Sequence, residues 1–226
     1  MNTPISKKKD SMVGEAYTQI RRRILDVVWM PGYQAMEQDV ALALGMSRTP
    51  VREAMIRLQR EGLVDVVPRH GMRVLPVSPT DMREIYQVLT ALECMAAELL
   101  AARKPSSDDL LPLVAATTAM DEALKVDDLD AWAVADERFH ALLVDLSGNR
   151  QLKDTVLNYW DRAHRARMFT LRLRPKPVNS TKEHLQMVEC LRAGDVQGAA
   201  QVTRAHRERA NRELVAIFER YKLAHM

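Results

Sequence analysis

The segment Pro76-Val77-Ser78-Pro79 divides the chain into two parts with different secondary-structure patterns. Before it, glycines, prolines and short apolar runs indicate helices mixed with strands, whereas after it only helical patterns are recognisable. The segment also begins a helix, because Ser78 can act as the N-cap, Pro79 suits the first turn and Asp81 completes a capping box. We therefore predict two domains, at residues 11–77 and 78–222.

The excess positive charge lies before this boundary. Residues 1–80 carry 12 Lys and Arg against 8 Asp and Glu, whereas the remainder carries 21 against 22. This asymmetry favours a polyanionic partner for the first domain. Residues 1–10 contain Lys7-Lys8-Lys9 with no apolar run after them, so they are predicted to form a flexible basic N-terminus rather than a signal peptide.

Composition excludes several classes of protein. An apolar fraction of 47% is too high for a disordered chain. Cys94 and Cys190 cannot build a disulfide framework, which indicates a reducing, cytosolic setting. No apolar run approaches the ~20 residues that span a bilayer, so no membrane partner is expected.

The first domain has the pattern of a winged helix-turn-helix. Apolar spacing and turn residues predict three helices and two strands, at about 11–29, 37–44, 48–61, 63–67 and 72–75. A short helix, a glycine turn, a second amphipathic helix and a hairpin are the components of this fold. The helix at 48–61 is therefore the expected recognition helix.

The recognition helix presents polar residues at its N-terminal end. Its apolar stripe would be buried, which turns Arg48, Thr49 and Arg52 outward. Arginine can contact guanine with two hydrogen bonds, and Ser47 and Thr49 can bind phosphates. The wing tip is basic and short, consisting of Arg69-His70-Gly71. A solvated charged face is the alternative interpretation, but these residues lie where DNA contact requires them.

The second domain is predicted to be an all-α bundle of about six helices. The helices are expected at about 79–103, 107–126, 128–147, 150–173, 180–193 and 195–222. Ser180-Thr181-Lys182-Glu183 has the spacing of a second capping box. The fold class is thus mainly α, with a winged helix-turn-helix at the N-terminus.

Four residues of the bundle could hold a metal ion. Asp136 and His140 are four residues apart, so both emerge on nearly one face of a helix. With His184 and His206, they would form a nitrogen and oxygen site for zinc, or for nickel or another divalent transition metal. Spacing alone leaves open that these are ordinary core or surface residues.

The first domain resembles the DNA-binding domain of GntR-type bacterial transcription regulators. The resemblance rests on Met36-Glu37-Gln38-Asp39-Val40, on Leu44-Gly45-Met46 and above all on Ser47-Arg48-Thr49-Pro50-Val51-Arg52-Glu53-Ala54. It implies that Arg48, Thr49 and Arg52 read the operator, that Ser47 contacts phosphate, and that Gly71 lets the wing approach DNA. Gln38 stands where many relatives have Arg or Lys, so an altered operator is expected.

The second domain resembles the FadR-type FCD effector domain. The resemblance rests on Asp136-Glu137-Arg138-Phe139-His140, Ser147-Gly148-Asn149, Glu183-His184, Leu191-Arg192-Ala193-Gly194-Asp195 and His206. In the metal-binding branch of that domain these positions hold the ion, which implies the ligand set Asp136, His140, His184 and His206.

The resemblance implies a small carboxylate effector beside the metal. Arg165 and Arg172 are seven residues apart on the expected helix and would share a face, so we select them as candidate effector ligands. A solvated charged face is equally compatible with this spacing. Relatives often carry Arg where this chain has Leu89, which leaves the effector class open.

We expect a cytoplasmic bacterial transcription regulator, and we weigh three alternative functions. The first is a homodimeric repressor that binds a palindromic double-stranded operator and releases it when the effector binds. The second is a metal-dependent hydrolytic or lyase-type enzyme tethered to a DNA-binding head. The third is a DNA-binding dimer whose bundle binds no ligand. No general base or nucleophile motif supports the enzyme, so the first alternative is adopted and no catalytic residues are expected.

Overall fold

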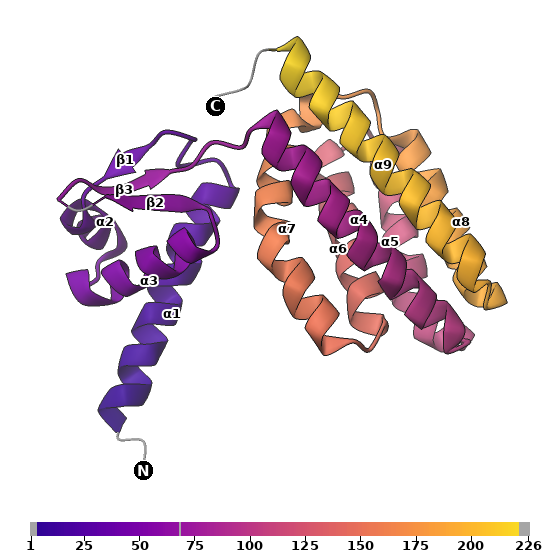
Figure 1. Ribbon diagram of the computed structural model, residues 1–226, viewed down its shortest axis with the longest axis horizontal. Coiled ribbons are helices and arrows are strands. Elements are labelled where there is room, and N and C mark those ends of the chain that lie inside the picture. The colour runs from indigo at the N-terminus through magenta and orange to yellow at the C-terminus, as the bar shows by residue number, and fades with distance from the viewer. Residues whose placement is uncertain (1–3, 68, 222–226) are drawn as a thin grey trace.

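The computed structural model describes residues 4–67 and 69–221 and contains two lobes, a head and a helical bundle (Figure 1). The head contains α1 (Pro4–Leu25), β1 (Gln34–Ala35), α2 (Glu37–Leu44), α3 (Arg48–Arg60), β2 (Val64–Val67) and β3 (Gly71–Val74). The bundle contains α4 (Pro79–Ala102), α5 (Ser107–Lys125), α6 (Leu129–Leu146), α7 (Arg150–Thr170), the 3₁₀ turn η1 (Leu171–Leu173), α8 (Val178–Ala193) and α9 (Val196–Arg220). The predicted fold class is confirmed.

The head has its own hydrophobic core. α1 packs against α3, and α3 contacts both α2 and β2. Ile20, Met55 and Leu58 are fully buried between these elements, as the apolar stripes of the two helices require. The core leaves the polar face of α3 in solvent, which is where DNA contact was predicted.

The wing is a three-stranded antiparallel sheet with the order β1-β3-β2. The sequence predicted β2 and β3 but missed β1, because a two-residue strand leaves no alternating pattern. Gly71 begins β3 with φ +77° and is buried. A Cβ atom there would lie 2.1 Å from the carbonyl oxygen of Ala35, so only glycine permits the β1–β3 pairing. The role of Gly71 in DNA approach stays a prediction, but the sheet already requires this glycine.

The bundle is built around α4, which packs along α9 and also contacts α6, α7 and α8 (Figure 1). The predicted N-cap of α4 is confirmed: the Asp81 amide donates to the Ser78 hydroxyl at 3.0 Å, and the Ser78 amide donates back to the Asp81 carboxylate. By length and composition α4 is apolar enough to cross a membrane. More than half of its most apolar window is buried inside the bundle, which is typical of the core helix of a helical domain.

Three helix boundaries differ from the predictions. α1 begins at Pro4, so the expected flexible segment is helical from that residue onward. α8 begins at Val178 without a side-chain cap, so the predicted capping box at 180–183 is wrong. α7 ends at Thr170 and Arg172 lies in η1, so Arg165 and Arg172 do not share one helix face.

The head and the bundle meet along α7, the bundle helix that lies nearest to the head (Figure 1). The Arg21 guanidinium of α1 donates two hydrogen bonds to the Asp161 carboxylate of α7. Next to this pair, Arg162 donates to Asp81 at 3.0 Å and lies against Gly62 of the head. Helix α7 therefore contacts the head through the Arg21–Asp161 ion pair and through the Arg162 side chain, which lies against Gly62.

Candidate metal centre and DNA-binding face

Most of the predicted DNA-contacting residues of the head line one groove. This groove has a volume of about 440 Å³ and is formed by the start of α2, by α3 and by the wing. Five of its lining residues were candidates from the sequence, namely Gln38, Arg48, Arg52, Arg69 and Gly71. Thr49 lies beside it and is exposed, as are Ser47 and His70. The fold thus brings residues from three segments to one face.

Glu37 is a member of this face that sequence reasoning missed. Its carboxylate oxygens lie 3.5 Å from an Arg48 guanidinium nitrogen and 3.6 Å from one of Arg52. Both arginine side chains remain mostly exposed. Glu37 therefore holds two long cations on the same side of the groove while leaving their outer donors in solvent.

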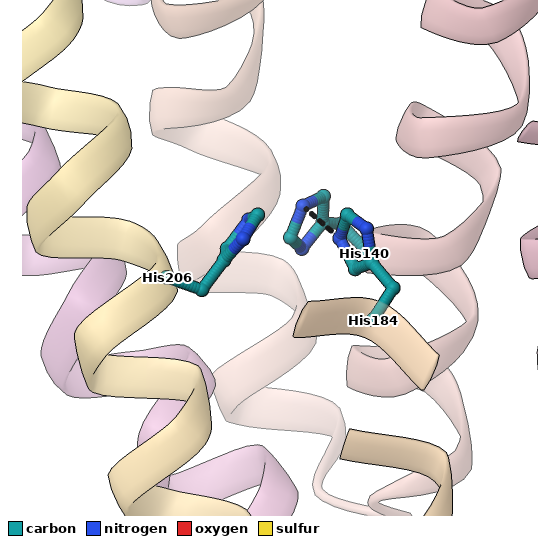
Figure 2. A group of neighbouring side chains, drawn as sticks. All are labelled: His140, His184 and His206. Atoms are coloured by element: carbon teal, nitrogen blue, oxygen red, sulfur yellow. Dashed lines mark hydrogen bonds between the residues drawn. The ribbon is translucent and has the colours of Figure 1, made fainter. Parts of the chain in front are cut away.

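The bundle brings together four side chains from three helices. Asp136 and His140 come from α6, His184 from α8 and His206 from α9, and all four are buried. One ring nitrogen from each histidine lies within 4.8 Å of the others, and the three rings converge in Figure 2. Asp136 Oδ1 is 3.8 Å from His140 Nε2 and 3.7 Å from His184 Nε2. All four predicted metal ligands are therefore neighbours.

Two carboxylates orient the histidine rings. Glu93 of α4 lies 2.9 Å from His140 Nδ1, and Glu183 of α8 lies 2.8 Å from His206 Nδ1. Carboxylates that accept from one ring nitrogen leave the other nitrogen available as a ligand, which is the usual support of a histidine metal site. The Nε2 atoms of His140 and His184 face each other at 3.2 Å. Two cationic groups neutralise the supporting carboxylates, Arg207 at Glu93 and Arg209 at Glu183.

The sequence reasoning placed none of Glu93, Arg207 and Glu183 as a support of the histidine cluster. A glutamate within the apolar stretch of α4 was the available signal for Glu93. Glu183 was assigned to a capping box, whereas it bonds His206 and Arg209. Burial raises the pKa of Glu183, but the hydrogen bonds from Arg209 and His206 outweigh burial and lower this pKa to about 2. The group is therefore an ionised acceptor at neutral pH.

The protonation states of the cluster suit a transition metal. Burial and the nearby Arg207 charge hold the pKa of His140 well below its usual range, and burial and His206 do the same for His184. Burial alone would raise the pKa of Asp136, but Arg167 and the histidines lower it below its usual range. Neutral imidazoles and an ionised carboxylate are the forms that bind metals. The buried Nδ1 of His184 has no hydrogen-bond partner among the described residues.

The arginines selected from the sequence lie elsewhere. Arg172 is exposed and pairs with Asp130 at 2.7 Å. Arg165 is buried beside the linker and lines a cavity that none of the four predicted metal ligands lines. The buried cation that contacts Asp136 is Arg167, which donates to its carboxylate. It lies two residues from Arg165, about 200° around the same helix.

Two further residues resolve questions from the sequence. His164 lies outside the histidine cluster, and its Nδ1 is 3.0 Å from a carboxylate oxygen of Glu137. Leu89, at the position where relatives often carry Arg, is buried in the bundle core. The bundle therefore supplies its buried positive charge from α7 and α9 instead of from this position of α4.

Comparison with known proteins gives matches for both lobes. Residues 84–209 match the FCD domain, and residues 13–74 match the family described as bacterial regulatory proteins, gntR family. These two ranges correspond to the bundle and the head.

Three similar proteins illustrate these matches. An uncharacterised HTH-type transcriptional regulator from the TAR-I ttuE-ttuC' intergenic region of Agrobacterium vitis is 50% identical over 134 residues, which cover 58% of this chain and 78% of that protein. The transcriptional repressor RspR of Escherichia coli K12 is 27% identical over 80% of this chain and 79% of its own. Among solved structures, E. coli McbR/YncC superposes with a TM-score of 0.76 at 20% identity, over 93% of this chain and 98% of that one.

Proposed function

The chain belongs to the GntR family of bacterial transcription regulators and carries an FCD domain, and from this we propose that it is a repressor that senses a small organic acid in a metal-containing pocket. The observation that carries the proposal is the buried cluster of three histidines and Asp136 in the bundle of a DNA-binding protein. Its family and relatives are regulators, so the enzyme alternative is not adopted.

We propose that the head binds double-stranded DNA through α3 and the wing. The groove arginines Arg48 and Arg52 lie at the N-terminal end of α3, which enters the major groove in helix-turn-helix proteins. Ser47 and Thr49 are assigned to phosphates, and Gln38 and the wing tip Arg69-His70-Gly71 to flanking contacts. One head offers few base contacts, so we infer a homodimer that reads palindromic half-sites about one helical turn apart.

For the metal, we propose Asp136, His140, His184 and His206 as ligands and zinc as the ion, with nickel or another transition metal as competitors. Three nitrogen donors and one carboxylate oxygen match the chemistry of these borderline ions. An ion that accepts five or six ligands would, if held by these four side chains, leave one or two positions for a carboxylate oxygen. Glu93 and Glu183 would hold the ligand rings in place, since each bonds an outer ring nitrogen.

The effector is proposed to be a small carboxylate that binds beside the cluster. Arg167 is the buried cation at Asp136, so we assign it the effector contact in place of Arg165 and Arg172. The same helix carries Asp161, which binds Arg21 of the head. A shift of α7 on effector binding would therefore change the position of the head, and with it the spacing of the two heads on DNA.

Binding assays on the purified protein test this function. Genomic fragments that the protein retains would identify the operator, and a fluorescently labelled operator would then be titrated with metal-loaded and metal-stripped protein. We expect a small carboxylate to release the operator from the loaded protein and to have less effect on the stripped one. Equal release from both forms would contradict the metal-containing sensor, and failure to retain any specific fragment would contradict the DNA-binding role. The expected place of action is the bacterial cytoplasm.

A further inference from the structure

Arg165 is a buried cation without a partner. It lies in α7, and the residue is 2% exposed. Its Nε, Nη1 and Nη2 atoms have no hydrogen-bond partner among the described residues. Buried guanidinium groups normally donate to carboxylates or carbonyls, because an unpaired buried charge is strongly destabilising. The arrangement of the two lobes therefore carries an electrostatic penalty at this residue.

Both lobes enclose Arg165. It lines a small cavity whose other walls come from the segment after α1, from the linker before α4, from α7 and from α9: Val27, Pro31, Val77, Ala166, Phe169 and Phe218. The volume of about 10 Å³ is no larger than the minimum space for one water molecule, so no counter-ion fits beside the guanidinium. Val27 and Pro31 belong to the head. The head therefore helps to keep Arg165 away from bulk water.

The nearby carboxylate is committed to other donors. Arg162, one turn before Arg165, donates to Asp81 at 3.0 Å, and Asp81 also accepts from the amide and the hydroxyl of Ser78. Arg162 in turn lies against Gly62 of the head. Burial, and then the Arg162 charge, lower the pKa of Arg165 to about 10, so the group is still protonated at neutral pH. The charge of Arg165 thus stays uncompensated while the head lies on α7.

The head side of the same contact is strained as well. Val27 has φ +57° just after the end of α1, a left-handed conformation that β-branched residues rarely adopt. Helices commonly end with glycine in this conformation, because glycine adopts it without a steric cost. Val27 and Arg165 line the same cavity. Two unfavourable features therefore meet at one contact between the lobes.

The neighbouring part of the junction is a polar cleft. It has a volume of about 510 Å³ and lies between α1 and α3 of the head and α6 and α7 of the bundle. Most of its lining residues are polar or charged, among them Tyr17, Glu61, Glu137 and Asp154. The Arg21 side chain, which binds Asp161 here, is 36% exposed, and ion pairs that water reaches contribute little stability. The lobes can therefore separate at this cleft without exposing a large apolar surface.

We propose that Arg165 opposes docking of the head on α7, so that the two lobes are poised to separate. While the head is docked, the guanidinium is buried without an acceptor. When the head leaves, Val27 and Pro31 uncover the cavity, and water and counter-ions reach the guanidinium. The free protein therefore exchanges between a docked and an open arrangement. This inference does not rest on the proposed function, because it concerns the chain without DNA or effector.

The reaction rate of a buried thiol measures this opening. In a chain with Cys94→Ala and Cys190→Ser, the substitution Val77→Cys places one thiol in the cavity wall, where Val77 is 4% exposed. Its reaction rate with a thiol reagent, divided by the rate in the unfolded chain, gives the fraction of time that the junction is open. Arg165→Met keeps an apolar chain in the site and should lower this rate at least about tenfold, because the buried charge is gone. The control Arg172→Met removes an exposed arginine and should leave the rate unchanged.

Equal rates with and without Arg165→Met would overturn the proposal. A rate that depends on urea as strongly as global unfolding does would also overturn it, because the thiol would then react only in the unfolded chain. Asp161→Asn retains Arg165 and tests the opening even where Arg165→Met folds poorly. It breaks the contact with Arg21 and should raise the rate, because the head is the part that moves. An unchanged rate in Asp161→Asn would refute release of the head.

Discussion

The buried pair formed by Asp136 and Arg167 allows the strongest single test of the bundle site. Both side chains are buried, and Arg167 donates directly to the Asp136 carboxylate. Removing one partner of a buried pair costs about 3–5 kcal/mol, because the other charge is left uncompensated. For a chain of this size each kcal/mol lowers Tm by about 2–4 °C, so Asp136→Ala should lower the Tm of the chelator-treated protein by about 6–20 °C.

A double variant separates the ion pair from the metal. Asp136→Ala combined with Arg167→Met removes both charges, so most of the lost stability should return. Metal binding should not return, because the carboxylate ligand is still missing. Calorimetric or optical melting measures the first effect, and elemental analysis after dialysis measures bound metal per chain.

The matched control is Asp130→Ala, which breaks the exposed pair with Arg172. Surface pairs contribute about 0–1 kcal/mol, so its Tm should change by less than about 4 °C. A single Asp136→Ala variant as stable as the control would refute the energetic reasoning. A double variant that keeps one tightly bound ion per chain would refute Asp136 as a ligand.

Three further predictions concern DNA binding, coupling and pH. Arg52→Ala should weaken operator binding by about 1–3 kcal/mol and relax base preference, whereas equal losses on operator and random DNA in anisotropy titrations would reject base readout. Asp161→Asn removes the carboxylate that binds Arg21, so the effector should shift operator affinity less than in the native protein, while the metal content is unchanged. An unaltered shift in the same titration would exclude coupling between effector and DNA through the contact of α7 with α1. The pKa values of His140 and His184 are low in the folded chain, so below about pH 6.5 the unfolded chain binds more protons, and the free energy of unfolding decreases as the pH is lowered. In the metal-free protein the slope should approach about 2.7 kcal/mol per pH unit, which corresponds to two protons. Urea unfolding between pH 5 and 7 that shows no such slope would contradict neutral buried rings.

Local chemistry explains why much of the fold was predictable. The capping box of Ser78 and Asp81 acts within one turn, and the structure confirms that it begins the helix predicted there. The recognition helix was located within one residue because its apolar spacing and the glycines around it act locally. Asp136 Oδ1 lies 3.8 Å from His140 Nε2 because residues four apart on a helix share a face.

Interactions between distant segments decided the rest. Glu183 fits a local capping pattern, yet it accepts from His206 and Arg209 of α9, because α8 and α9 pack side by side. The two-residue strand β1 exists only because β3 pairs with it across Gly71. Such contacts have no signature at a fixed sequence spacing.

The sequence by itself determined the helix that begins at Arg48, the cap at Ser78 and the placement of Asp136 and His140 on one helix face, because periodicity and capping act over one or two turns. The tertiary structure decided which charged side chain contacts which partner. Arg165 and Arg167 are equivalent in local sequence, but the packing of α7 places one at Asp136 and the other at the junction of the two lobes. Burial and partners are properties of packing, so they, and the chemistry that follows from them, appear only when the chain is folded.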